Sequence, residues 1–78
     1  MTTIIAVTEM AGMPGRFECT HQTGPRGRVY STTHAGHGPE AAAAYAVQIA
    51  LQTGGPYVIM GPKKMLDCIP PEIRARSA

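Results

Sequence analysis

Hydrophobic and polar residues alternate along the first half of the chain in the pattern of β-strands. Residues 2–9 are rich in β-branched side chains, and residues 16–21 and 28–33 alternate between apolar and polar positions. Glycine- and proline-containing segments at 10–15 and 22–27 separate the three strands. Because short turns join neighbouring strands that run in opposite directions, we expect a three-stranded antiparallel meander.

The same alternation predicts which side chains face the interior. Phe17 is the only phenylalanine, so we expect its side of the second strand, with Cys19 and His21, to face the core. In the third strand we expect Val29 and Ser31 to point inward. The outer face is then predicted to carry Arg16, Glu18, Thr20, Arg28, Tyr30 and Thr32.

One long helix is predicted between Gly38 and Gly54. Pro39 suits the first helical position, and Glu40 places negative charge near the positive end of the helix dipole. Six alanines in this segment give it the highest helix propensity available. Gly54 can adopt the left-handed conformation that ends a helix, and Pro56 prevents its continuation.

The helical repeat of 100° per residue divides this segment into two faces. The face expected to pack on the sheet consists of Ala43, Ala46, Val47, Ala50 and Leu51. The face expected to contact solvent consists of Ala41, Tyr45, Gln48 and Gln52. Since the inner face is mostly alanine, the helix backbone must lie close to the sheet that it covers.

The remaining chain is short and interrupted by proline. Residues 56–60 read as a strand that residues 61–64 end, residues 65–69 as a fifth strand or one helical turn, and residues 72–76 as a last helical turn. We therefore predict one domain over residues 1–78 of the α+β class. It is an antiparallel β-meander with one alanine-rich helix on one face, in the order β-β-β-α-β with a further strand left open.

Composition limits the classes of function. The chain is 44% hydrophobic and only 15% charged, with a net charge of +2, which is weak for a nucleic-acid-binding protein. No apolar run approaches the roughly 20 residues that cross a bilayer. The N-terminal segment has no basic stretch before an apolar core, so we expect no signal peptide and a cytoplasmic protein. We expect Cys19 and Cys68 to be reduced there.

Two groups of residues resemble parts of chemical sites. Cys19 and His21, with His34 and His37, are zinc-ligand types, but their spacing matches no strong zinc pattern. Cys19 beside a histidine resembles a nucleophile pair, but it shares the face of Phe17, where a core thiol is expected. We predict neither a metal nor a cofactor, no small-molecule substrate and no enzymatic activity.

Basic and tyrosine side chains are the remaining candidates. Six basic residues are expected to be exposed, as ordinary solubilising charge or as one patch gathered from the second turn, the end of the last strand and the tail: Arg26, Arg28, Lys63, Lys64, Arg74 and Arg76. Exposed tyrosines offer apolar area together with a hydroxyl group, which suits protein interfaces. The predicted partner-binding residues are Arg26, Arg28, Tyr30, Tyr45, Lys63 and Lys64.

Several segments taken together resemble one small protein family. They are Val7-Thr8-Glu9 followed by Pro14-Gly15 and an aromatic strand, Ala35-Gly36 before Pro39, the alanine run 41–46, Tyr57-Val58-Ile59-Met60-Gly61, and Ile69-Pro70 leading to Ile73-Arg74. Their order and spacing are similar to the anti-CRISPR proteins of mobile genetic elements, in particular the group-five inhibitors of type I-F systems. The similarity spans nearly the whole chain.

The resemblance implies a non-enzymatic inhibitor in the cytoplasm of a bacterial host. It would bind a type I CRISPR surveillance complex and block target-DNA binding or nuclease recruitment. Tyr45 stands where the family carries a basic residue, and Cys19 and Cys68 have no family counterpart, so type I-C is as consistent a target as type I-F.

Two alternatives remain open. One is a small nucleic-acid-binding module, in which Arg16, Arg28 and Tyr30 pair with and stack on single strands. The other is a homodimer that pairs through an open sheet edge. The first predicts a steep salt dependence of nucleic-acid binding, and the second a size that depends on protein concentration.

Overall fold

A computed structural model describes residues 2–34 and 38–75 of the chain. Its elements are β1 (Thr3–Glu9), β2 (Phe17–Thr23), β3 (Tyr30–His34), α1 (Gly38–Thr53), β4 (Tyr57–Met60), α2 (Lys63–Leu66) and α3 (Pro71–Ala75). Residues 35–37, which include the predicted His37, and Arg76 in the tail lie outside the described residues. No helix in the described ranges is long and apolar enough to cross a membrane.

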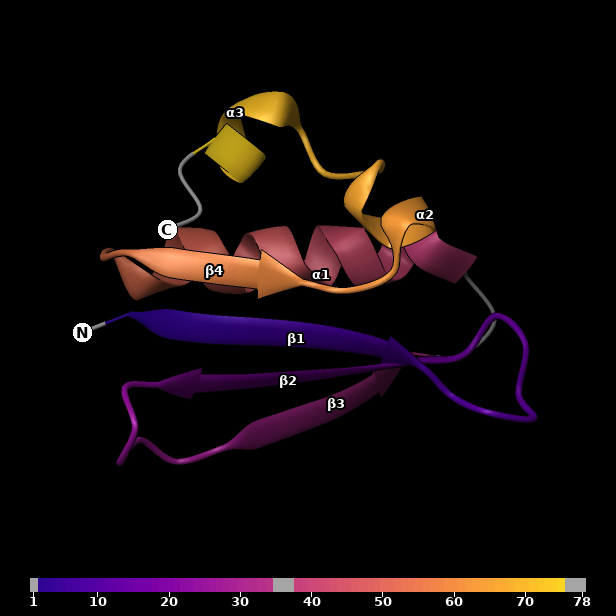
Figure 1. The fold of residues 1–78 in the computed structure, drawn as a ribbon, viewed down its shortest axis with the longest axis horizontal. Helices are drawn as coiled ribbons and strands as arrows, with labels where there is room; N and C mark the ends of the chain where they lie inside the picture. The colour runs from indigo at the N-terminus through magenta and orange to yellow at the C-terminus, as the bar shows by residue number, and fades with distance from the viewer. Residues whose placement is uncertain (1, 35–37, 76–78) are drawn as a thin grey trace.

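The strands form one sheet in the spatial order β3-β2-β1-β4. β2 pairs antiparallel with both β1 and β3, which confirms the predicted meander. β4 lies on the other side of β1 and runs parallel to it. Because parallel strands need a long crossover, α1 connects β3 at one edge to β4 at the other, and Figure 1 shows it behind β4.

The core lies between the sheet and α1. Ile5 and Phe17 are fully buried in it, and Ala42 and Ala46 of α1 are equally inaccessible. Alanines at these positions let the helix backbone approach the strands closely, as predicted. Gly54 has a φ of 69° and ends α1 in the left-handed conformation that glycine adopts without strain. The predicted α+β class, with one helix on one face of the sheet, is confirmed.

The predicted rotation of α1 about its axis is partly wrong. Ala42 and Ile49 are buried although neither was assigned to the inner face, whereas Leu51 is 62% exposed. Tyr45, assigned to the solvent face, is half-buried and packs against the core. After Glu40 the helix carries no charged residue, so its pattern defines no clear polar side and did not determine which of Ile49 and Leu51 is buried.

The facing predicted for the third strand is wrong as well. Tyr30 pairs with His21 and Thr32 with Cys19, so both lie on the side of α1 and not on the outer face. Val29, predicted to point inward, precedes β3 and is 58% exposed. Ser31 is also exposed. The residues before β3 are irregular, so their alternation does not continue into the strand. The register of β3 is set by its pairing with β2.

The end of the chain forms two short helices, α2 and α3, so the helical-turn alternative holds and the fifth strand does not form, and α3 lies where the last helical turn was predicted. Met65 and Ile69 are buried, and the Tyr57 hydroxyl of β4 donates a hydrogen bond to the Ile73 carbonyl oxygen at 2.9 Å. A β-carbon at Gly61 would meet the end of the Met65 side chain and approach Val7, so a larger residue where the chain passes from β4 to α2 requires Met65 to shift. Figure 1 shows α2 and α3 beside β4, away from β3.

Candidate interaction surface

The sheet has one face that α1 covers and one that it does not. We call the second the outer face; it consists of Ile4, Ala6, Thr8, Glu18, Thr20, Gln22, Ser31, Val58 and Met60. None of these nine side chains is buried. Glu18 and Thr20 lie there as predicted. The face therefore remains accessible to a partner.

The apolar side chains of the outer face lie on β1 and β4. Ile4 lies between Gln22 of β2 and Val58 of β4, and Ala6 lies between Thr20 and Met60. Ile4 is 48% exposed and Met60 is 54% exposed. Neighbouring large apolar side chains that stay exposed are typical of surfaces that bind another molecule.

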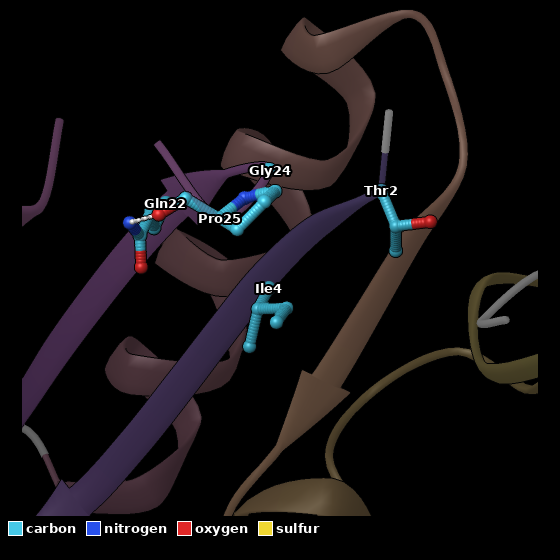
Figure 2. A pocket seen from close by; sticks show the side chains of 5 residues that line it. All are labelled: Thr2, Ile4, Gln22, Gly24 and Pro25. Carbon is cyan, nitrogen blue, oxygen red and sulfur yellow. Dashed lines mark hydrogen bonds between the residues drawn. The ribbon is translucent and has the colours of Figure 1, made fainter. Parts of the chain in front are cut away.

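A hollow of about 350 Å³ opens beside Ile4. We call it the hairpin hollow; it is lined by Thr2, Ile4, Gln22, Gly24 and Pro25, and Figure 2 shows these residues. The Gln22 Nε2 group donates hydrogen bonds to the carbonyl oxygens of Gly27 at 2.8 Å and Pro25 at 3.3 Å. The Gly24 N–H group donates to the Thr2 carbonyl oxygen at 3.0 Å. These bonds fix the turn between β2 and β3 against the start of β1.

Three of the predicted partner-binding residues lie together at this turn. Arg26 is exposed within it. The Arg28 guanidinium lies 5.7 Å from the centre of the Tyr30 ring, at cation–π distance. Tyr30 also stacks on His21, with ring centres 5.0 Å apart, and is 52% exposed. The structure thus brings Arg26, Arg28 and Tyr30 to one end of the sheet.

Lys63 and Lys64 lie elsewhere. The Lys64 ammonium group contacts both carboxylate oxygens of Glu9, at 2.8 and 2.9 Å, and lies 5.7 Å from the centre of the Phe17 ring. The Lys64 hydrogen bond holds the pKa of Glu9 below its usual range. Glu9 ends β1, whereas Arg26 is beside its start, and seven strand residues span about 23 Å. A single basic patch of the predicted kind is therefore not formed.

Tyr45 has a role inside the molecule. Its hydroxyl group is 3.0 Å from the Thr32 hydroxyl of β3, so a hydrogen bond joins α1 to the edge of the sheet. Sequence reasoning gave Tyr45 to the solvent face and missed this contact. The arrangement leaves only part of the side chain accessible to a partner.

The cysteine chemistry weighed from the sequence finds no support at Cys19. The side chain is fully buried, and burial raises the pKa of its thiol to about 11. A thiol in this state is not the thiolate that nucleophilic catalysis requires. Within residues 2–34 and 38–75, no group of three or more His, Cys, Asp or Glu side chains is placed to hold a metal ion. Cys68 is exposed and both cysteines are free thiols.

The apolar part of the outer face was missed by the sequence analysis. Its signal was present, because residues 4–7 and 57–60 are apolar at consecutive positions and not at every second one. A strand with this pattern has apolar side chains on both faces, while the chain offers a helix to cover only one. Ile4, Val58 and Met60 are the residues that this argument identifies.

The fold and this face define a small α+β protein with an open sheet surface. No family model matches the chain, and no curated protein matches it.

Proposed function

We propose that the protein is a non-catalytic inhibitor that binds a type I CRISPR surveillance complex and blocks target-DNA binding or nuclease recruitment. The single observation that supports binding is the accessible outer face, with Ile4 and Met60 about half exposed on a strand pair whose other side forms the core. The target is suggested by the resemblance to the group-five type I-F inhibitors. Type I-C is the second target to examine.

Three of the segments that carry the resemblance belong to the main elements of the fold. Val7-Thr8-Glu9 ends β1, the alanine run belongs to α1, and Tyr57 to Met60 form β4. Such segments support a shared architecture, because they place the helix and the parallel strand pair. Val58 and Met60 of β4 also lie on the outer face, together with residues outside these segments such as Ile4 and Gln22, so the choice of CRISPR subtype depends on experiment.

The test is binding of the purified protein to reconstituted type I-F, I-C and I-E complexes, each with and without target DNA. We expect a stoichiometric complex with at least one of them and a corresponding loss of DNA binding or cleavage. Inhibition should saturate at one inhibitor per binding site, because an occluding protein does not turn over. Absence of binding to all three complexes, in both DNA states, contradicts the proposal.

A small nucleic-acid-binding module is the second candidate. The observation that favours it is the half-exposed Tyr30 ring with Arg28 above it, an arrangement that suits base stacking. It predicts a mobility shift of single-stranded DNA or RNA at low salt that weakens steeply as salt is added. No shift at low salt excludes this candidate.

A further inference from the structure

We propose that the hairpin hollow is the anchor point of the interaction surface and that it accepts an apolar side chain from an acidic protein surface. This inference rests on the proposed function, because it requires a protein partner. It adds where on the surface and by which chemistry that partner is recognised. It concerns the end of the sheet at which β1 and β4 begin and β2 ends.

The chemistry of the hollow favours an apolar group. Ile4 forms one wall with nearly half of its surface exposed, and Pro25 forms another. The Gln22 amide is directed to the turn carbonyl oxygens, so its N–H groups are already engaged within the protein. A volume of about 350 Å³ is at the lower end of the range for ligand pockets and suits one inserted side chain of a larger partner.

The charges around the hollow favour an acidic surface. Arg26 follows Pro25 directly and is exposed, whereas the Arg28 guanidinium lies over the Tyr30 ring on the α1 side of the sheet. The segment from residue 19 to residue 39 contains no Asp or Glu, so no carboxylate in this segment neutralises Arg26. An exposed cation beside an apolar pocket attracts a partner that places carboxylates next to its apolar side chain, which gives orientation and faster association.

The hollow is also held in shape before a partner arrives. The Gln22 side chain bonds two carbonyl groups of the turn, and the Gly24 N–H group bonds Thr2. Gly24 has a φ of 70°, which glycine adopts without strain. A preformed site loses little conformational freedom on binding, which strengthens the complex.

The first experiment uses matched charge changes at and away from the hollow. Ile4→Glu places a carboxylate in it, and Leu51→Glu makes the same change at a position of α1 that is 62% exposed. Arg26→Glu reverses the charge at the rim, and Arg74→Glu does so on α3, where Arg74 is exposed. All four sites are exposed, and circular dichroism and urea unfolding verify that each variant folds.

Binding is measured to the CRISPR complex that captures the unmodified protein. We expect Ile4→Glu and Arg26→Glu to weaken this binding by about tenfold or more. The two control variants should weaken it by less than about twofold. Unchanged binding of Ile4→Glu overturns the inference while the proposed function stands. Equal losses in Ile4→Glu and Leu51→Glu also overturn it, because the effect is then not specific to the hollow.

The second experiment does not depend on CRISPR. A heptapeptide of Asp and Glu with a central Leu is titrated into the ¹⁵N-labelled protein, alongside a peptide with Ser for Leu and one with Lys for the acidic residues. We expect saturable amide shifts at Ile4, Gln22 and Gly24 with the first peptide only. If no CRISPR complex binds, the proposed function fails and these shifts alone decide the inference; their absence overturns it.

A third arm titrates single-stranded DNA. Binding that is lost in Arg26→Glu but kept in Ile4→Glu assigns Arg26 to phosphate recognition and overturns the inference in favour of nucleic acid.

Discussion

Ile4 and Ile5 are neighbours in β1 with the same side chain, yet Ile4 is 48% exposed and Ile5 is fully buried. The pleat of the strand sends them to opposite faces. On the inner face, α1 covers the sheet with small alanine side chains. On the outer face, apolar residues of comparable size have no such cover. The comparison shows that hydrophobic side chains serve two purposes in this protein, cohesion on one face and accessible contact surface on the other.

The largest expected effect tests this comparison directly. Ile5→Ala should lower the free energy of unfolding by about 2–5 kcal/mol, because it leaves a cavity in the core. Ile4→Ala should cost less than about 1 kcal/mol, since nearly half of that side chain already contacts water. Urea unfolding measures both. Equal costs at the two positions contradict the distinction between the faces, and Ile5→Val provides a milder variant if Ile5→Ala does not fold.

The next effect concerns the fit of α1 on the inner face. Ala46 is fully buried, so Ala46→Leu should overfill the interface and cost about 1–3 kcal/mol in unfolding free energy. Ala44 is exposed on the same helix, and Ala44→Leu serves as the matched control with a change near zero. Thermal and urea unfolding report both values. A tolerated Ala46→Leu means that the helix is not closely packed on the strands.

A smaller effect is expected at the border between the two faces. Tyr45→Phe removes the hydrogen bond between the Tyr45 and Thr32 hydroxyl groups and should cost about 0.5–1.5 kcal/mol. A double-mutant cycle with Thr32→Val tests the pairing. The combined cost should be less than the sum of the single costs, because each single change already breaks the bond. Strict additivity contradicts a direct contact between α1 and β3.

The smallest effect depends on pH. The hydrogen bond from Lys64 lowers the pKa of Glu9, so the folded protein binds fewer protons than the unfolded chain at mildly acidic pH. The contribution to stability is present above the ordinary pKa of Glu and is lost as the pH falls through the lowered pKa. Lys64→Gln should therefore be less stable than the unmodified protein at neutral pH, and the difference should shrink in acid.

The measurement for this pair is the urea midpoint of both proteins from neutral pH down to about pH 2. Lys63→Gln is the control, because no ion pair of Lys63 is found among the described residues. A constant difference for Lys64→Gln across the range contradicts the assignment of the effect to Glu9.

Local sequence signals determined the elements and their layering. β-branched alternation defined the strands, short glycine turns made them antiparallel, and the alanine run between Pro39 and Gly54 defined the helix. The sequence also placed Phe17 and Cys19 in the core, since the two faces of β2 differ clearly from each other in polarity. These features depend on contacts between residues close in the chain, which a pattern can represent.

Tertiary structure alone decided the features that depend on distant contacts. The parallel pairing of β4 with β1, the register of β3 and the rotation of α1 each follow from packing between separate segments. The weak polar pattern of α1, which has no charged residue after Glu40, and the irregular residues before β3 carried no local signal for these choices. The hairpin hollow arises for the same reason, because Thr2 and Ile4 meet Gln22 and Pro25 only when β1 pairs with β2.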